Sequence, residues 1–321
     1  MKKSYIIPFI FIFIFFIISG CREENETYNP NKVKVGYLPL VSNITHFVAM
    51  EKGFYKEEGL SVEPTLLASS DLTDDMLFEN HIDIAIEMSI VPLLLHLEKD
   101  PNHSKIFSTS RITNDNSFDG ILVKQNSKFG KLEDLAGKKV GVFPGITAKN
   151  IFIKLFASKY PMLEAPNCIE INSKLHLDYL EDDSVDAIFT YEPYLTIGID
   201  NKGFKQISTS IYAMQFSPNP LTVGAINNEF LLKKPEAAKS FFKAIDKAVE
   251  FIKKNPEEVR KIIAKSMFID SAIASKMNIM PNTLSKEIDF QNLDDYIQLL
   301  KTNGFINSTP KAKEICVKSI N

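Results

Sequence analysis

The chain has 321 residues and a formal net charge of −3 at pH 7, from 37 Lys and Arg against 40 Asp and Glu. This length is enough for two ordinary domains or one bilobal domain, and 45% hydrophobic with 24% charged residues is typical of a globular protein. A mildly acidic chain without a basic patch gives no electrostatic reason to expect a nucleic acid as partner.

The first 20 residues have the pattern of a secretory signal peptide: two lysines, an apolar run over 5–18, and then small residues. The segment 18–21, Ile-Ser-Gly-Cys, resembles a bacterial lipobox. This resemblance implies cleavage before Cys21, a lipid on its thiol, and a position outside the cytoplasm on the periplasmic or cell-surface side of a bacterial membrane. The alternative is an uncleaved anchor helix. The run is short of the roughly 20 apolar residues that a membrane span needs, and Pro8 interrupts it.

Residues 21–31 are polar and acidic, and we expect them to form a tether between the lipid and the folded body. After the tether, short apolar runs alternate with helical patterns. Expected strands in this first set are 33–37, 60–67, 82–86, 105–110 and 119–124. Expected helices are 45–58 and 71–78, the second with Asp71 as a possible cap.

The pattern then begins again. Further strands are expected over 139–143, 168–171, 187–190 and 204–208, with a helix over 147–160. Strands that alternate with helices are typical of parallel sheets built from βα units, and two successive sets indicate two similar lobes.

The last third of the chain has a helical pattern after a strand expected at 221–226. Pro235 suits the first turn of a helix. Beyond it, apolar residues recur at three- and four-residue steps on one face: Ala238, Phe241, Phe242, Ile245, Ala248, Val249 and Ile252.

Cysteines and histidines give no support for a metal or cofactor site. Cys168 and Cys316 have apolar neighbours, so two buried free thiols are expected in preference to a disulfide. The sequence has no CxxC and no HExxH.

Six segments carry a family resemblance: VGYLP at 35–39, VAMEKGFYKEEGLSVE at 48–63, IDIA at 82–85, DGILV at 119–123, LEDLAGKKVGV at 132–142 and VDAIFTYEPY at 185–194. In this order and spacing they resemble the solute-binding proteins of ABC importers. The most similar branch takes up nitrate, taurine, alkanesulfonates and thiamine-pyrimidine precursors, and it also contains the fungal thiamine-pyrimidine synthases.

The resemblance implies the type 2 periplasmic binding protein fold: two doubly wound α/β lobes, joined by two crossing segments, with a helical C-terminal part. The crossings are expected near 118–123 and 221–226. Lobe 1 would combine 32–118 with 221–321, and lobe 2 would be 119–220. The resemblance also implies a monomer that holds a small solute between the lobes and delivers it to an ABC permease, without catalysis.

Ligands of parallel α/β sheets bind beyond the carboxyl ends of the strands, where helices begin. This rule favours the loops 38–46, 68–71, 87–90, 143–149 and 191–194. The candidate solute-binding residues in these loops are Ser42, Asn43, His46, Ser69, Ser70, Met88, Ser89, Gly145, Ile146, Thr147, Tyr191, Glu192 and Tyr194.

Several candidates have a plain structural alternative: helix capping for the serines, Asn43 and Thr147, and core packing for His46 and Met88. The Asn43-x-x-His46 spacing is similar to that of the pyrimidine-binding members, and the turn 145–147 resembles the family's Gly-x-Thr turn.

Glu192 is followed by a proline and flanked by tyrosines, and in the family this Glu-Pro step lines the cleft. Its carboxylate can accept from an amine or a ring N–H, while tyrosines offer a flat stacking face. A surface loop carboxylate is the alternative for Glu192.

The chain has only three arginines, at 22, 111 and 260. Arginine forks are well suited to planar oxyanions, whereas the candidate loops carry Asp71, Glu87 and Glu192. We therefore expect an uncharged or amine-bearing organic solute, such as a pyrimidine-like heterocycle. Nitrate or an aliphatic sulfonate such as taurine is the alternative. An enzyme like the fungal pyrimidine synthases is a distant one, because the cysteine-rich iron motif of those proteins is missing here.

Overall fold

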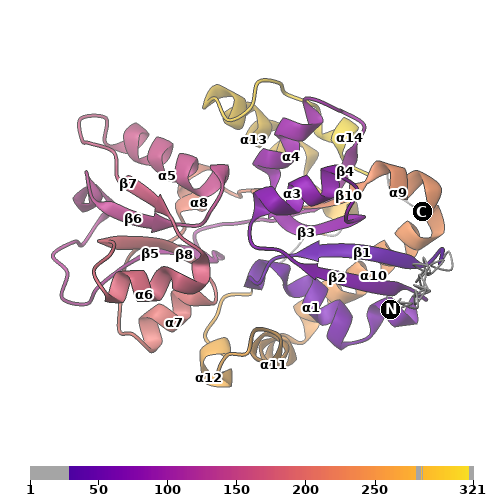
Figure 1. Cartoon of the computed structure of the whole chain (residues 1–321), viewed down its shortest axis with the longest axis horizontal. Coiled ribbons are helices and arrows are strands. Elements are labelled where there is room, and N and C mark those ends of the chain that lie inside the picture. Colours follow the sequence, from indigo (N-terminus) through magenta and orange to yellow (C-terminus); the bar gives the residue numbers. More distant parts are fainter. Residues whose placement is uncertain (1–28, 280–282, 284, 318–321) are drawn as a thin grey trace, which may run out of the picture.

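The computed structural model describes residues 29–279, 283 and 285–317. The expected signal peptide, Cys21 and most of the tether lie outside the described residues. The fold consists of two five-stranded sheets, each covered by helices (Figure 1).

The first sheet has the strand order β2-β1-β3-β10-β4. Its strands are β1 (Lys32–Tyr37), β2 (Ser61–Leu66), β3 (Ile84–Ser89), β4 (Ser104–Thr109) and β10 (Thr222–Asn227). The second sheet has the order β7-β6-β8-β5-β9. Its strands are β5 (Asp119–Val123), β6 (Lys139–Val142), β7 (Asn167–Glu170), β8 (Ala187–Tyr191) and β9 (Lys205–Ser208). Each sheet with its helices is called a lobe below, the first sheet being in lobe 1.

The two sheets have the same topology, which confirms the expected pair of similar α/β lobes. They are mixed, however, and not purely parallel as expected. β10 runs antiparallel to β3 and β4, and β5 runs antiparallel to β8 and β9. The reason is connectivity: each of these strands enters its sheet directly from the other lobe, without the βα crossover that makes neighbouring strands parallel.

Residues 110–118 and 216–221 connect the lobes and lie side by side. The Ser110 amide donates to the Thr222 carbonyl (2.8 Å), and Ile112 and Asn219 exchange backbone hydrogen bonds of 3.1 and 2.8 Å. The crossings were expected slightly later in the chain, at 118–123 and 221–226. Nearly all of those residues instead lie within the sheets, as β5 and β10.

Helices cover both faces of each sheet. Those before β5 are α1 (Ile44–Glu51), α2 (Phe54–Glu57), α3 (Ser70–Phe78) and α4 (Ile90–Leu97). Lobe 2 carries α5 (Ile146–Lys159), α6 (His176–Glu181), α7 (Tyr194–Asp200) and α8 (Ile211–Gln215). After β10 come α9 (Asn228–Lys233), α10 (Pro235–Lys254), α11 (Pro256–Met267), α12 (Ser271–Ala274), α13 (Phe290–Thr302) and α14 (Ala312–Ile315).

Two helix boundaries differ from the expectation. The helix expected over 45–58 is divided into α1 and α2 by Gly53, whose φ of +75° suits glycine. Asp71 does not cap α3. Ser69 is the N-cap, and its Oγ accepts from the Leu72 amide at 3.2 Å. Asp71 therefore lies inside the first turn, with its carboxylate available for another contact.

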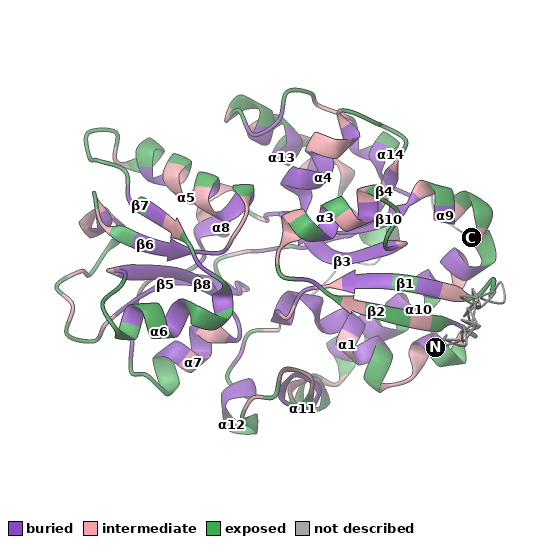
Figure 2. Cartoon of the chain, in the orientation of Figure 1, coloured by how far each residue is buried: buried purple, intermediate pink, exposed green. Residues whose placement is uncertain are grey.

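The amphipathic pattern after Pro235 forms α10, with its apolar face buried as expected (Figure 2). Phe241 is fully buried, stacks on Tyr55 (5.5 Å between centroids) and contacts Phe107 edge-on at 5.9 Å. Phe107 belongs to β4, so α10 joins the first sheet to α2 in one core.

Cys168 and Cys316 are buried free thiols, as expected. Burial raises the pKa of each thiol to about 12, so neither is a reactive thiolate near neutral pH. Within the described residues, no helix combines the length and the apolar character that a membrane crossing needs.

Candidate functional site

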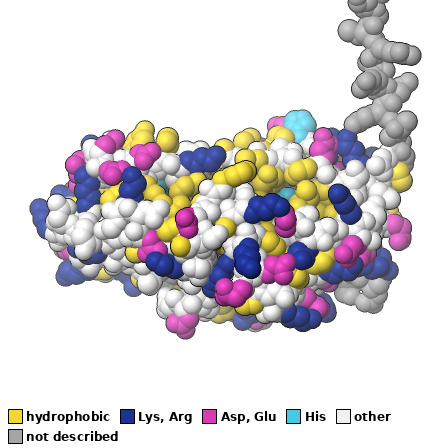
Figure 3. Space-filling model, turned by 90° about the horizontal axis from the view of Figure 1, so that it is seen from below, with side chains coloured by type: hydrophobic (Ala, Val, Ile, Leu, Met, Phe, Trp, Pro, Cys, Tyr) yellow, Lys and Arg dark blue, Asp and Glu magenta, His cyan; other side chains and the backbone are white. Residues whose placement is uncertain are grey.

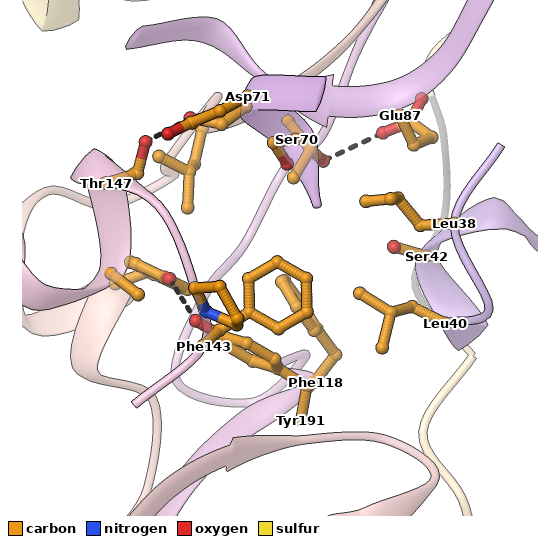
Figure 4. A pocket seen from close by; sticks show the side chains of 16 residues that line it. Leu38, Leu40, Ser42, Ser70, Asp71, Glu87, Phe118, Phe143, Thr147 and Tyr191 are labelled. Carbon is orange, nitrogen blue, oxygen red and sulfur yellow. Dashed lines mark hydrogen bonds between the residues drawn. The ribbon is translucent and has the colours of Figure 1, made fainter. Parts of the chain in front are cut away.

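A small cavity lies between the lobes (Figure 4). The cavity has a volume of about 40 Å³. Because roughly 10–15 Å³ is enough for one water molecule, it is large enough to hold water. Lobe 1 contributes Leu38, Leu40, Ser42, Ser70, Asp71, Glu87 and Ser89, and the crossing segments and β10 contribute Phe118, Leu221 and Thr222. Lobe 2 contributes Phe143, Pro144, Thr147, Ala148, Tyr191 and Tyr212.

Most of these residues follow the carboxyl ends of strands β1, β3, β6 and β8, or begin helices α3 and α5. The cavity is therefore at the position that the α/β rule gives for a ligand.

Two carboxylates face the cavity, on Asp71 and Glu87 (Figure 4). Glu87 is buried at the end of β3, and its φ of +46° departs from ordinary strand geometry. Its Oε1 accepts from the Ser108 hydroxyl at 3.1 Å, and its Oε2 accepts from the Thr222 hydroxyl at 2.8 Å. Burial raises the pKa of Glu87 to about 7, and the two hydroxyl donors only partly oppose this rise.

No Lys, Arg or His occurs among the described residues that line the cavity. Arg111 is exposed in the first crossing segment, and Arg260 donates to the carbonyls of Ala274 and Met277. Of the acidic and basic side chains, the described lining of the cavity therefore carries only the carboxyls of Asp71 and Glu87.

The opposite wall of the cavity is aromatic and is formed by Phe118, Phe143, Tyr191 and Tyr212. The rings of Tyr191 and Tyr212 are nearly parallel (10°), and their hydroxyls are 2.7 Å apart. Phe118 and Phe143 lie 5.4 and 5.5 Å from the Tyr191 ring. Buried Asp119 positions Tyr212, because its carboxylate accepts from the Ile211 amide at 2.6 Å at the start of α8.

The two lobes contact each other directly around the cavity. The hydroxyls of Ser89 and Thr147 are 2.9 Å apart. The Ile146 amide of lobe 2 donates to Oδ2 of Asp71 in lobe 1 at 3.1 Å. On another side, the Val41 amide donates to the Glu192 carbonyl at 3.5 Å. Together these contacts describe a closed cleft.

The structure brings five of the predicted site residues to the cavity: Ser42, Ser70, Ser89, Thr147 and Tyr191. They come from both lobes, and the most distant two, Ser42 and Tyr191, are 149 positions apart in the chain. Thr147 does not cap α5, whose N-cap is Gly145. Its hydroxyl contacts Ser89 instead.

The side chain of Glu192 is not brought to the cavity. Its carboxylate accepts from the amide (3.1 Å) and the hydroxyl (2.7 Å) of Thr196, in the first turn of α7. The residue is buried, which raises its pKa to about 7. The position just past β8 is as expected, but the start of α7 takes up the carboxylate that was expected to meet the solute.

Four other predicted residues support the cavity from behind. Asn43 accepts from the Leu38 amide at 3.1 Å and donates to Ser42 Oγ at 3.2 Å, holding the loop after β1. His46 Nδ1 is 3.0 Å from the Tyr55 hydroxyl, and burial lowers the pKa of this imidazole to about 3. Ser69 caps α3 and Met88 is fully buried in the core.

Gly145 and Ile146 form the start of α5 beside the cavity, without lining it. Tyr194 lines a second groove between the lobes, with Tyr37, Pro39, Phe47, Leu66, Lys174, Pro193, Ile197, Ser266, Met267, Phe268 and Ile269. Phe268 is 96% exposed. Hydrophobic side chains gather in the middle of the face seen from below (Figure 3).

Sequence reasoning missed Asp71, Glu87, Phe118, Phe143 and Tyr212 as lining residues. Asp71, Glu87 and Phe143 lie in candidate loops, so the loop rule contained a signal for them. Tyr212 lies on α8, outside every candidate loop, and only the tertiary structure brings it to the cavity.

Within the part of the chain that the structure describes, one group outside the cavity has metal-ligand side chains: Asp74 and Asp75 on α3, and His96 on α4. His96 Nδ1 contacts Asp74, while its Nε2 faces Asp75 at 3.8 Å. The carboxylates face different ring nitrogens and only Asp74 is hydrogen-bonded to His96, so this group resembles an Asp–His pair with a nearby carboxylate more than a convergent ligand set.

Comparison with known proteins places the chain. Residues 42–259 match the family described as NMT1/THI5 like. A putative aliphatic sulfonates-binding protein of Bacillus subtilis is 22% identical, with 88% of this chain and 83% of that protein covered. A 4-amino-5-hydroxymethyl-2-methylpyrimidine phosphate synthase of Saccharomyces cerevisiae is 26% identical, with 71% and 68% covered.

Two solved structures show the same architecture. The alkanesulfonate-binding protein SsuA of Xanthomonas axonopodis pv. citri, bound to MOPS, superposes with a TM-score of 0.74 at 11% identity, with 91% of this chain and 100% of that chain covered. The nitrate-binding protein NrtA of Synechocystis PCC 6803 gives 0.69 at 19% identity, with 89% and 84% covered. The chain therefore has the fold of the periplasmic binding proteins and belongs to the NMT1/THI5-like family.

Proposed function

We propose that this protein is a lipid-anchored solute-binding protein of an ABC importer, which captures a small organic solute with an amine or ring N–H between its lobes. The observation that carries the choice of solute is the charge of the cavity: two carboxylates and, among the described lining residues, no cationic side chain. Family membership and the closed interlobe cleft support the binding role.

Recognition is assigned to Glu87 and the aromatic wall. Each carboxylate oxygen has more than one lone-pair site, so Glu87 can accept from a solute N–H while keeping its bonds to Ser108 and Thr222. Across the cavity, the Tyr191 and Tyr212 pair offers flat surface for a heterocycle. An amine close to Glu87 would also favour ionisation of this carboxyl, because an opposite charge lowers its pKa.

Transport requires no covalent step. The solute binds the closed form better than the open form and shifts the population toward closure. The closed protein then delivers the solute to the membrane permease.

A nitrate or an aliphatic sulfonate is the second candidate, and it is favoured by the names of the Bacillus subtilis relative and of the two solved structures. The cavity argues against it. An anion there would face the Asp71 carboxylate in a poorly solvated site, where like charges repel strongly, and above about pH 7 it would also face an ionised Glu87. A catalytic role is favoured only by the name of the yeast relative.

The test is thermal unfolding of the full-length chain in detergent, with an aminopyrimidine, an aliphatic amine, taurine, an alkanesulfonate or nitrate. At about 100 times Kd, a ligand stabilises by about 2.7 kcal/mol, a rise of several degrees in Tm. We expect this rise with the aminopyrimidine or the amine. A rise with only nitrate or the sulfonates would contradict the proposed solute, and turnover of a bound compound would contradict the binding role.

A matched pair of variants tests Glu87. Glu87→Gln should lose most of the Tm rise, whereas Glu236→Gln, an exposed change on α10, should keep it. If the solute raises the Tm of Glu87→Gln as much as that of the parent, the Glu87 carboxylate does not recognise the solute.

The lipid anchor is tested separately by mass spectrometry of the protein from membranes. We expect a diacylated Cys21 as the first residue, and a Cys21→Ser variant that retains its signal segment and lacks the lipid. An unmodified Cys21 in the membrane fraction would contradict the anchor.

A further inference from the structure

We infer that Asp71 is an interlobe latch, whose carboxylate occupies the start of helix α5 and takes the place of an anionic solute. This inference rests on the proposed function, because it gives a physical reason why an anion would be excluded from the same cleft.

The N-terminus of α5 has the features that favour binding of an anion. The helix is 14 residues long and begins at Ile146 in lobe 2. The first amides of a helix have no partner within the helix, and its dipole favours negative charge there. Oδ2 of Asp71 accepts from the Ile146 amide at 3.1 Å.

The neighbouring amide is also taken by a carboxylate. Oε2 of Glu170, at the end of β7, accepts from the Gly145 amide at 3.2 Å. Two amides at this helix end are thus paired with carboxylates, one from each lobe.

The local backbone is shaped for close approach of Asp71. A Cβ on Gly145 would lie 2.8 Å from Asp71 Oδ2, and the φ of +110° at Gly145 is one that other residues rarely adopt. Glycine here allows the carboxylate to reach the helix end.

The Asp71 carboxylate is available for the contact with the Ile146 amide because Ser69, and not Asp71, caps α3. Asp71 lies in the first turn of α3, and its carboxylate points across the cleft toward the segment that carries Thr147 (Figure 4). The other two contacts around the cavity, between Ser89 and Thr147 and between Val41 and Glu192, join neutral groups. Asp71 supplies the charge-assisted bond among these three, and such bonds are about twice as strong as neutral ones.

Two consequences follow. Closure adds a second carboxylate beside Glu170 at the helix end and occupies the Ile146 amide that an oxyanion would otherwise use, so the closed cleft selects against anionic solutes. Removal of this charge should loosen the closed form and open the helix end to an external anion.

The experiment is hydrogen–deuterium exchange of the full-length chain in detergent, without organic solute, where a working latch already populates the contact between Asp71 and Ile146. Exchange is followed in peptides that contain residues 143–149. In Asp71→Ala we expect exchange in this segment to become about tenfold faster, the scale expected for loss of one charge-assisted bond at a helix start. Addition of sodium sulfate should slow the exchange again in the variant and leave the parent unchanged. Sodium chloride at equal ionic strength is the salt control.

Asp75→Ala is the matched control, because Asp75 lies on the same helix with a side chain 60% exposed. We expect it to exchange like the parent. Asp71→Asn keeps an oxygen acceptor without the charge, so we expect a smaller acceleration. This variant also serves as the test if Asp71→Ala does not fold.

Unchanged exchange in both Asp71 variants would overturn the latch, and so would fast exchange that sulfate does not slow. The outcome is independent of the solute panel. If exchange changes as expected but no amine or pyrimidine stabilises the protein, the latch is supported and the proposed solute is contradicted.

Discussion

Glu87 and Glu192 are both buried carboxylates, and burial raises the pKa of each to about 7. Their partners differ. Glu87 lies on the cavity wall between two hydroxyls from β4 and β10, whereas Glu192 turns into its own helix and pairs with Thr196. At the residue scale, the direction of the side chain therefore decides which carboxylate can meet a solute.

The first prediction concerns the pH dependence of stability through Glu87. The folded protein keeps a proton on Glu87 from the ordinary pKa of 4.5 up to about 7, whereas the unfolded chain loses this proton near 4.5. The free energy of unfolding should therefore fall as pH rises through this window, by about 3 kcal/mol from this group. Glu87→Gln should remove that part of the decline.

The measurement is urea unfolding of parent and variant at pH 4.5, 6 and 8 without solute. We expect the variant to gain stability relative to the parent as pH rises. A difference that stays constant with pH would show that folding does not raise the pKa of Glu87.

At the scale of elements, β5 and β10 are the strands that make each lobe depend on the other half of the chain. Each runs antiparallel to both of its neighbours, and each follows a crossing segment. Helix α10 follows soon after β10 and packs its apolar face on the first sheet. The C-terminal helices thus complete the core of the lobe in which the chain began.

The second prediction tests this completion with Phe241→Ala on α10. Phe241 is fully buried against Tyr55 and Phe107, and truncation of such a side chain costs about 3–5 kcal/mol. Lys243→Ala, on the exposed side of the same helix, should change stability by less than about 0.5 kcal/mol. Urea unfolding measures both, and similar costs for the two variants would contradict the packing.

At the scale of the whole molecule, the cleft is made only when the lobes meet. Ser89 ends β3 in lobe 1, Thr147 lies in the first turn of α5 in lobe 2, and their hydroxyls are 2.9 Å apart. Backbone hydrogen bonds between Ile112 and Asn219 hold the two crossing segments together.

The third prediction is a coupling between the lobes. In a cycle of Ser89→Ala, Thr147→Val and the double variant, we expect a coupling of about 1 kcal/mol in the affinity for whichever solute stabilises the parent. The physical reason is that each single change leaves the other hydroxyl without its partner in the closed cleft. Calorimetric titration measures the affinities, and additive losses would show that the two hydroxyls are not paired in the bound state.

The sequence by itself determined the elements and the broad chemistry. The succession of strands and helices, the amphipathic face of α10 and the buried thiols depend on local periodicity and on apolar neighbours, and these are visible along the chain. The scarcity of arginine against the acids of the candidate loops likewise needed no coordinates. A lipid-bearing Cys21 and the solute itself stay predictions.

Only the tertiary structure decided which side chains face the cleft. Ser42 and Asn43 are adjacent, yet one lines the cavity and the other holds the loop behind it. Asp71 was one candidate for the cap of its own helix, and it instead accepts from an amide 75 positions away. The physical reason is that these roles depend on strand direction, on helix caps and on the meeting of two lobes, all of which join residues that local patterns cannot connect.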